Sequence, residues 1–395
     1  MNLREMSEQE DHREVLARTL SGGWSEQYGR SFRVSLDGGD QLWIVQPCLS
    51  AYCTRSVTRE GRRFMVERFR FTPVIARIPL QWTLGTALGS KPGLRLAPAG
   101  FWVTPALPGS DHMVAIPGTR RIRTFDFSLK KTRSLLKAGF DRHAILNELL
   151  IRESRQGPFI PISHSDPDGA WFEESIVPGY PLPRCPPSWN RGALERRAFE
   201  RLLEWLDASI VDSARGGYPQ AVHDRLEHSL QKLRLLYPEH DRLVLSDWPE
   251  ALLRAAATSS PHELAQTHGD FQPGNVHVAR AGRRVFLHDW ESTDVRERHY
   301  DLFTYGLQAR YPRGLADRLW RYVQEGKWRL NLALLPHLTT KEQRRSAVAL
   351  FLLEDLERAA SEAASSPYKA PPFGLRLLCA ELATFGPRLE SLLTA

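Results

Sequence analysis

The chain has 395 residues, of which 42% are hydrophobic and 10% aromatic, a composition that excludes a largely disordered protein and suits two or three compact units. Lys and Arg outnumber Asp and Glu by 53 to 46, a modest and evenly spread surplus that suits anionic ligands but does not indicate nucleic-acid binding. No stretch approaches the roughly 18 apolar residues of a membrane span. The charged segment from Met1 to Arg18 lacks the apolar core of a signal peptide. The four cysteines, Cys48, Cys53, Cys185 and Cys379, show no paired spacing of a metal site or a disulfide framework. We therefore expect a cytoplasmic protein.

The first part of the chain predicts short strands. Between residues 29 and 77, segments such as Phe32–Leu36 and Leu42–Val45 alternate or cluster like strands. Their role is not apparent from the sequence, and residues 1–105 are treated as a flanking α/β region.

Residues 106–180 predict a small sheet with one helix. Arg121–Phe127 and Arg133–Lys137 have the pattern of a hairpin, and Trp171–Val177 has that of a further strand. Asp141 is placed to cap a helix over residues 142–154. Its apolar residues Ile145 and Leu149 would face the sheet.

After the proline-marked linker at 181–183, the hydrophobic period becomes helical. Helical runs cover 193–211, 226–236 and 347–364, and two strand-like pieces interrupt them at 276–278 and 285–287. We expect residues 181–395 to form a larger helical lobe, which makes the whole an α+β, bilobal protein.

One loop carries the polar residues of a phosphotransfer site. Thr267–Asn275 reads THGDFQPGN and lies between a helical run and a short strand. A hydroxyl that attacks a γ-phosphoryl group needs a carboxylate to accept its proton, a task that suits Asp270. Asn275 offers a neutral oxygen to Mg²⁺, and Asp289, at the end of a predicted buried strand, offers a stronger ligand. This Asp, Asn and Asp pattern is the one found in protein kinases.

These motifs resemble the aminoglycoside phosphotransferase and choline kinase-like family, whose signature reads roughly H-G-D-x-x-P-G-N, then a hydrophobic strand ending in D-W-E. The chain has HGDFQPGN at 268–275 and LHDWE at 287–291. The resemblance covers about residues 116–357, and Gln272 stands where many relatives carry His. It implies a protein-kinase-like fold with Asp270 as the catalytic carboxylate, Asn275 and Asp289 as metal ligands, Glu291 assisting with a second ion, and Asp301 bracing the loop. His268 is expected to support the loop.

The resemblance also implies a nucleotide site in the sheet-rich lobe. A lysine there pairs with the α- and β-phosphates and is positioned by a helical glutamate. Lys137 and Glu148 fit these two roles, and Glu153 is the open alternative. Gly118 would let a turn approach the phosphates closely.

The adenine edge would be read by the backbone of Glu174 and Ile176. The implied activity is Mg²⁺-dependent transfer of phosphate from ATP or GTP to a hydroxyl of a sugar, aminosugar or aminoalcohol, and the oligomeric state is unknown. The competing hypotheses are a catalytically weak kinase-like nucleotide-binding module and a protein Ser/Thr kinase. Acidic candidates for a cationic acceptor are Asp207, Asp212, Glu354, Asp355 and Glu357, although a solvated helix face is the favoured interpretation of these positions.

Overall fold

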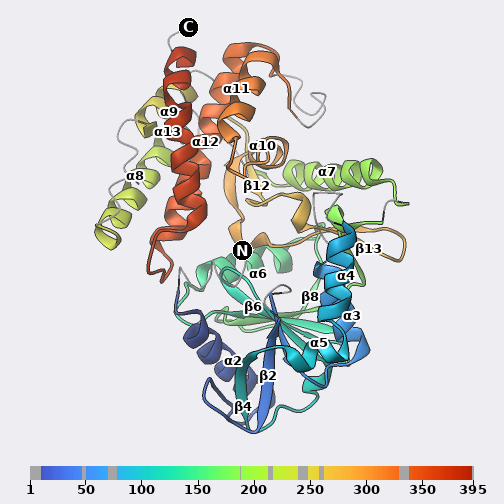
Figure 1. The fold of residues 1–395 in the computed structure, drawn as a ribbon. Coiled ribbons are helices and arrows are strands. Elements are labelled where there is room, and N and C mark those ends of the chain that lie inside the picture. Colours follow the sequence, from blue (N-terminus) through green and yellow to red (C-terminus); the bar gives the residue numbers. More distant parts are fainter. Residues whose placement is uncertain are drawn as a thin grey trace. The chain divides into compact units, whose positions relative to one another are not determined.

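The computed structural model describes residues 10–46, 50–69, 78–186, 188–211, 217–238, 248–257, 262–328 and 338–393. Cys48 and Asp212 lie outside these ranges. The chain divides into two compact units, unit 1 with Met1–Leu194 and His277–Phe286, and unit 2 with Glu195–Val276 and Leu287–Ala395 (Figure 1). Unit 1 is rich in strands and unit 2 in helices, as the α+β prediction required. No helix in the described ranges is long and apolar enough to span a membrane.

Unit 1 is built on a nine-stranded sheet, counted over the described residues, with the order β1-β4-β2-β3-β5-β6-β7-β9-β8. All neighbouring strands pair antiparallel. The strands are β1 (Arg33–Ser35), β2 (Gln41–Gln46), β3 (Ala51–Thr54), β4 (Ala99–Thr104), β5 (Met113–Pro117), β6 (Arg121–Asp126), β7 (Lys131–Leu136), β8 (Ile162–Ser165) and β9 (Trp171–Ser175).

The expected boundary at residue 105 is wrong. Strands β1 to β4 belong to the same sheet as β5 to β9, because β3 pairs with β5 at Tyr52 and Ala115. Residues 1–105 are therefore an integral half of this sheet. The boundary expected at residue 180 also differs, because unit 1 continues to Leu194 and includes the later segment His277–Phe286.

The two faces of the sheet are covered by different helices. Side chains alternate between faces along a strand, so Trp43 packs with helix α2 (His12–Tyr28) while Ile44 packs with helix α3 (Arg59–Phe69). On the α2 face, Trp24 lies against Trp43, with 5.2 Å between ring centroids. Two further helices, α4 (Ile78–Leu88) and α5 (Lys91–Leu96), follow α3.

The predicted hairpin and helix of residues 121–154 are present. Strands β6 and β7 pair in register from Arg121 with Leu136 to Asp126 with Lys131. Helix α6 (His143–Ser154) begins where Asp141 Oδ1 accepts a hydrogen bond from the His143 amide at 2.9 Å. Ile145 and Leu149 pack on Phe172 of β9, as their spacing predicted.

A small sheet explains why a distant hairpin belongs to unit 1. Strand β10 (Gly179–Pro181) pairs with β13 (Val276–Ala279), which in turn neighbours β14 (Val285–Leu287). The imidazole of His277 bonds Val177 O at 3.0 Å, and the Arg280 amide donates to Pro178 O at 2.8 Å. The segment after β9 is thus bound to residues a hundred positions away.

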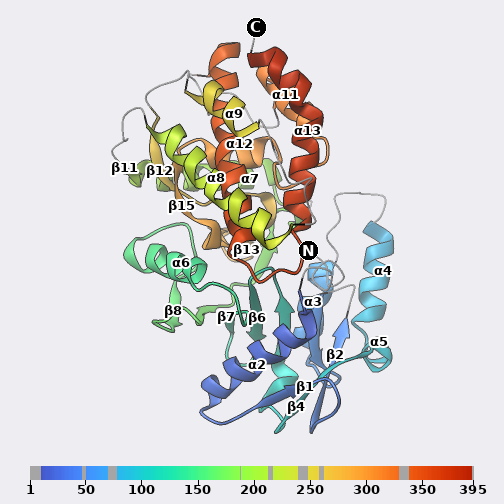
Figure 2. The ribbon, with the colours of Figure 1, turned by 90° about the vertical axis from the view of Figure 1, so that its left-hand side faces the viewer.

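Unit 2 is a helical body around α12 (Lys341–Ala364), which packs against α8, α9, α11 and α13 (Figure 2). Thr340 and Gln343 form a capping box at its N-terminus. The other helices are α7 (Arg191–Ala208), α8 (Tyr218–Leu236), α9 (Trp248–Ala256), α10 (Tyr300–Gly306), α11 (Leu315–Glu325) and α13 (Phe373–Leu393).

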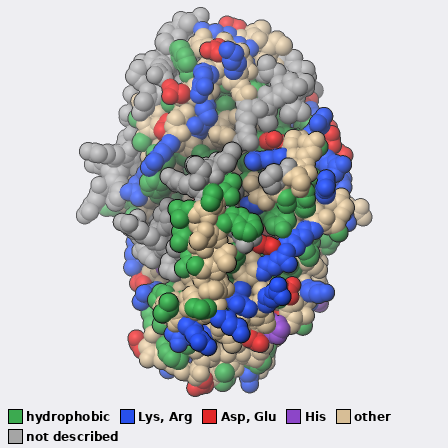
Figure 3. Space-filling model, turned by 45° about the vertical axis from the view of Figure 1, so that its right-hand side comes forward, with side chains coloured by type: hydrophobic (Ala, Val, Ile, Leu, Met, Phe, Trp, Pro, Cys, Tyr) green, Lys and Arg blue, Asp and Glu red, His purple; other side chains and the backbone are tan. Residues whose placement is uncertain are grey.

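A three-stranded sheet in unit 2 leads into the predicted loop. Its order in the described chain is β11-β12-β15, with bounds Ile210–Val211, Leu264–Thr267 and Asp294–Glu297. The loop therefore follows strand β12, whereas the sequence analysis expected a helix before it. A strand of this length is too short to show a hydrophobic period in the sequence. On the face shown in Figure 3, Lys and Arg side chains lie scattered among hydrophobic and other groups.

Candidate active site

The loop His268–Asn275 has a backbone that only glycine permits at its second position. Gly269 has a φ of +81°, and a Cβ there would overlap the Ser292 carbonyl, lying 2.6 Å from its carbon. The chain then closes a 3₁₀ turn at Pro273–Asn275. The loop is thus packed directly on the segment that follows Asp289.

Asp301, the residue expected to brace the loop, lies fully buried near the start of α10. Its Oδ2 accepts a hydrogen bond from the His268 amide at 2.6 Å, and its Oδ1 accepts one from the Gly269 amide at 3.0 Å. Burial raises the pKa of Asp301, while His268 and Arg296 act in the opposite direction. The carboxylate therefore fixes the backbone of the loop.

His268 supports the loop through both ring nitrogens. Nε2 lies 2.8 Å from His288 O, and the Asp270 amide lies 3.3 Å from Nδ1. A carbonyl can only accept and an amide N–H can only donate, so one neutral tautomer satisfies both contacts. The ring also packs on Trp290, with 4.5 Å between centroids. His268 thus ties the loop to the end of strand β14.

The Asp270 carboxylate is held by donors on both oxygens. Oδ2 accepts hydrogen bonds from Asn275 Nδ2 at 2.7 Å and from Gln272 Nε2 at 2.9 Å. Asn275 Nδ2 also donates to Asp270 O at 2.9 Å. Because both partners of this amide can only accept, its nitrogen must face Asp270. The Asn275 Oδ1 atom is then directed away from Asp270.

Asp289 follows strand β14 with φ 65° and ψ 59°. This left-handed conformation is uncommon outside glycine but is tolerated by Asp, and such backbone strain clusters at functional sites. The His288 amide donates to Asn275 O at 2.8 Å. The β13–β14 hairpin therefore brings Asp289 back beside Asn275.

The donor set fits magnesium. Asn275 and Asp289 supply an amide and a carboxylate oxygen, and Glu291 lies in the 3₁₀ turn Trp290–Ser292 that follows. Within the described ranges, no three His, Cys, Asp or Glu side chains gather into a metal-binding cluster. Mg²⁺ needs no such cluster, since it is usually held by one or two carboxylates with waters and substrate phosphates.

Arg310 also belongs to this site, and the sequence analysis missed it. Its Nε donates to Asp270 Oδ1 at 2.7 Å, and its Nη2 donates to Gly269 O at 2.6 Å. Arg310 follows α10 in a segment with no motif and no clear hydrophobic period. No sequence signal connects it with a loop 40 residues earlier.

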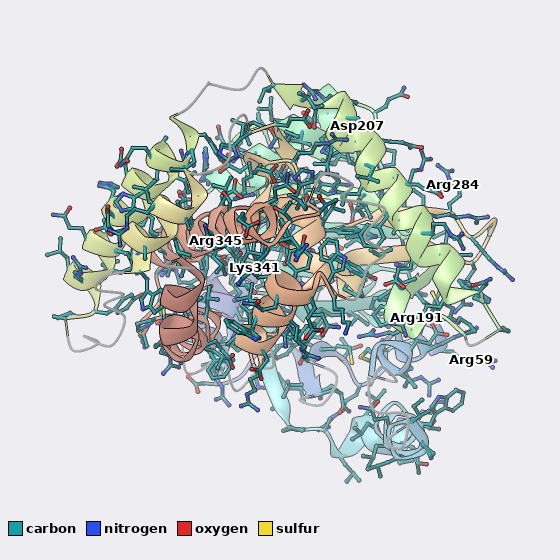
Figure 4. All side chains as sticks on the ribbon, turned by 90° about the horizontal axis from the view of Figure 1, so that it is seen from above. Arg59, Arg191, Asp207, Arg284, Lys341 and Arg345 are labelled. Atoms are coloured by element: carbon teal, nitrogen blue, oxygen red, sulfur yellow. The ribbon has the colours of Figure 1, made fainter. Side chains whose placement is uncertain are left out.

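The acidic candidates for an acceptor have different surroundings. Asp207, labelled on α7 in Figure 4, forms an ion pair with Arg298. Glu354 and Asp355 are buried, so the favoured interpretation of a solvated helix face is wrong for these two residues. Glu357 lies 3.8 Å from Arg225 and lines a cavity of about 430 Å³ between α8 and α12.

In unit 1, Lys137 contacts a carboxylate that the sequence analysis did not name. Lys137 Nζ lies 2.5 Å from Glu10 Oε1, and both side chains are buried. Glu148 forms ion pairs with Arg152 at 2.7 Å and with Arg121 at 2.8 Å. Glu153 accepts a hydrogen bond from Ser165 at 3.0 Å. Glu10 is thus a buried carboxylate partner of Lys137, and the pairing of Lys137 with Glu148 or Glu153 stays a prediction.

The other predicted nucleotide contacts are partly used within the fold. The Gly118 amide donates to Arg121 O at 2.7 Å across the β5–β6 turn. Glu174 is in a strand paired on both sides, and its carboxylate binds Arg152 at 2.5 Å. The Ile176 amide donates to Lys130 O at 2.9 Å. This N–H is therefore engaged within the fold, whereas the sequence analysis expected it to contact the adenine ring.

Among known proteins, the chain is similar to solved structures only at the level of the fold. No family model and no curated protein matches the chain. Solved structures do match, among them a choline/ethanolamine kinase family protein from Mesorhizobium loti, 14% identical with a TM-score of 0.40, covering 73% of this chain and 96% of that one. An ethanolamine kinase from Plasmodium vivax is also 14% identical, with a TM-score of 0.42 and coverage of 85% and 96%.

A third neighbour is an aminoglycoside phosphotransferase in a ternary complex with ADP and hygromycin B. It is 10% identical, with a TM-score of 0.41, and covers 71% of this chain and 93% of that one. All three are small-molecule kinases of the group that the sequence motifs resemble. No function is taken from them, because every one of these TM-scores lies below 0.5.

Proposed function

We propose that the chain is a small-molecule kinase that transfers the γ-phosphoryl group of ATP or GTP, with Mg²⁺, to a hydroxyl of a sugar, aminosugar or aminoalcohol. The observation that carries this proposal is the arrangement around Asp270. The Asp270 side chain remains 24% exposed, while Asn275, Gln272 and Arg310 fix it in place. A carboxylate held this way is suited to orient a hydroxyl and accept its proton.

Asp270 acts on the acceptor. The acceptor oxygen forms a bond to the γ-phosphorus as the bond from phosphorus to the β,γ-bridging oxygen breaks, and the hydroxyl proton passes to the Asp270 carboxylate. Because phosphoryl transfer depends mainly on positioning, the fixed carboxylate is the main contribution of this loop.

Asn275 Oδ1, Asp289 and Glu291 are the groups that would hold magnesium. When bound, the ion neutralises charge on the phosphates. Asn275 serves this role and also orients Asp270, since its two amide atoms face different partners. Changing Asn275 to Asp would replace that donor by a carboxylate facing Asp270.

Lys137 is the proposed ligand of the nucleotide phosphates in unit 1. Its ammonium group donates to Glu10 Oε1 at 2.5 Å. Glu10 is in turn 3.4 Å from His12 Nδ1, and His12 Nε2 is 3.2 Å from the Tyr52 hydroxyl. This buried chain of polar groups gives Lys137 a fixed position.

A second candidate function is a nucleotide-binding module with little catalytic activity. One observation favours it: Lys137, the group proposed to align the phosphates, is buried against Glu10, which would weaken that alignment for transfer. Such a module would bind nucleotide without acceptor-dependent turnover.

The two candidates are separated by an ADP-release screen. The chain is mixed with ATP or GTP, Mg²⁺ and a panel of sugars, aminoglycosides and aminoalcohols, and nucleotide binding is measured in parallel by calorimetry. A kinase releases ADP with at least one acceptor, and Asp270→Asn lowers the rate of this release by roughly 10²- to 10⁴-fold. Asp317→Asn, the same change at an exposed position of α11, leaves it intact. Nucleotide binding with no turnover would favour the module.

A further inference from the structure

Arg310 joins the Asp270 loop to a second buried acid. Besides its bonds to Asp270 and Gly269, its Nη1 donates to Asp355 Oδ1 on α12 at 2.7 Å, and its Nη2 lies 3.0 Å from the Tyr300 hydroxyl. All three guanidinium nitrogens are therefore engaged. Only 13% of the side chain is exposed.

The guanidinium of Arg310 lies in a cluster of paired charges. Asp355 Oδ1 also accepts from Arg358 Nε at 3.1 Å and from the Tyr300 hydroxyl at 2.7 Å. Arg358 Nη1 also pairs with Glu362 at 3.1 Å, so two arginines face three carboxylates, Asp270, Asp355 and Glu362. A buried charge is costly unless it is paired and hydrogen-bonded, so Asp355 and Arg358 compensate for an arginine placed beside the proposed base.

Asp355 is a charged anchor in this cluster. Burial by itself would raise its pKa, but the guanidinium groups of Arg310 and Arg358 outweigh burial and hold the pKa below its usual range. The anchor is therefore ionised at neutral pH. Arg310 has a fixed counter-charge on α12 that does not depend on Asp270.

We propose that Arg310 is a positioning residue for phosphoryl transfer, which holds the Asp270 carboxylate and the Gly269 carbonyl through two adjacent guanidinium donors and is itself anchored on Asp355. The catalytic part of this inference rests on the function proposed above. Asp301 fixes the backbone of the loop, whereas Arg310 fixes the reacting side chain.

The planar guanidinium is what this task requires. Nε and Nη2 diverge at a fixed angle, so one rigid group can bond a side-chain oxygen and the preceding carbonyl together. A lysine keeps the positive charge but supplies a single flexible donor point. Arg310→Lys is therefore expected to release the Asp270 side chain while it preserves the local charge.

The kinetic test compares Arg310→Lys with Arg344→Lys. Arg344 is a matched control, because it bonds backbone carbonyls of Val323 and Thr339 at 3.1 and 2.5 Å within unit 2. A displaced catalytic group costs on the order of 10²-fold in rate, so Arg310→Lys should lower kcat by roughly that factor. The affinity for MgADP should stay within about twofold, and Arg344→Lys should keep kcat.

A double-mutant cycle separates positioning from general support of the fold. If Arg310 acts through the Asp270 carboxylate, Arg310→Lys causes no further loss in an Asp270→Asn background. An equal loss in both backgrounds, or an unchanged kcat in the single variant, would overturn the proposal. ATP hydrolysis by water provides the rate if no acceptor is found.

A spectroscopic test needs no turnover and no change at Arg310. With ¹⁵N-labelled arginine, the Arg310 Nε–H signal, assigned from its backbone amide, should exchange slowly with solvent and shift in Asp270→Asn. A rapidly exchanging signal, or one that does not move, would refute the contact. A protected, shifted signal without any ADP release would instead confirm the contact and contradict the kinase proposal.

Discussion

Replacement of Gly269 by alanine tests whether the loop is built as described. The residue has a left-handed φ of +81°, which costs roughly 1 kcal/mol for a side chain other than glycine. The added Cβ would also overlap the carbonyl of Ser292, so the loop must shift away from that segment.

A shift of the loop breaks the hydrogen bonds from the His268 and Gly269 amides to Asp301. Each buried group left without a partner costs about 1–3 kcal/mol. Together with the backbone strain, Gly269→Ala should lower the free energy of unfolding of unit 2 by at least about 3 kcal/mol. Activity should fall with it.

The matched control is Gly274→Ala in the same loop. No atom of the described structure lies within 4 Å of a Cβ at Gly274, and its free energy of unfolding should change by less than about 0.5 kcal/mol. Urea unfolding followed by tryptophan fluorescence measures both variants. Equal stability of Gly269→Ala and the wild type would refute the description of the loop.

Two further predictions concern buried acids. Burial raises the pKa of Glu354 to about 8 in the folded protein, whereas a value near 4.3 is expected in the unfolded chain. The contribution of Glu354 to stability is therefore complete below about pH 4.3, and it is lost as the pH rises through the folded pKa. From this group, the free energy of unfolding should fall by roughly 1.4 kcal/mol per pH unit between about pH 5 and 8. Urea unfolding at several pH values measures this decline, which Glu354→Gln should remove. The same pH dependence in Glu354→Gln and the wild type would contradict the prediction. Glu10→Gln removes a carboxylate from the buried Lys137 ammonium, which should destabilise the protein by about 3–5 kcal/mol and weaken ATP binding measured by calorimetry. The exposed Glu153→Gln is its control, and equal effects of the two changes would show that Glu10 does not position Lys137.

Local sequence patterns predicted the loop His268–Asn275 and the hairpin beside it. Strand β14 has the predicted bounds of 285–287 and β13 extends the predicted 276–278 by one residue. The order of Asp270, Asn275 and Asp289 along this hairpin sets their proximity, because a hairpin returns the chain to its start. Short sequence separation made this part of the site predictable.

Long-range contacts explain what the sequence did not predict. Glu10 and Lys137 are 127 residues apart, and Arg310 and Asp270 are 40 apart. Neither pair has a periodic or motif signal, since each contact follows from how whole elements pack. For the same reason, the pairing of β3 with β5, which joins residues 1–105 to the sheet, was not foreseen.

The central claim is tested most directly by following the γ-phosphoryl group itself. ATP labelled at the γ-phosphate is incubated with Mg²⁺ and the acceptor panel, and the acceptors are separated and examined by mass spectrometry. The account predicts one acceptor that carries the label on a hydroxyl oxygen. Transfer should be lost on magnesium removal, strongly slowed in Asp270→Asn and Asp289→Asn, and retained in Asp317→Asn. Label transfer at the wild-type rate in Asp270→Asn, or bound nucleotide with no label on any acceptor, would contradict it.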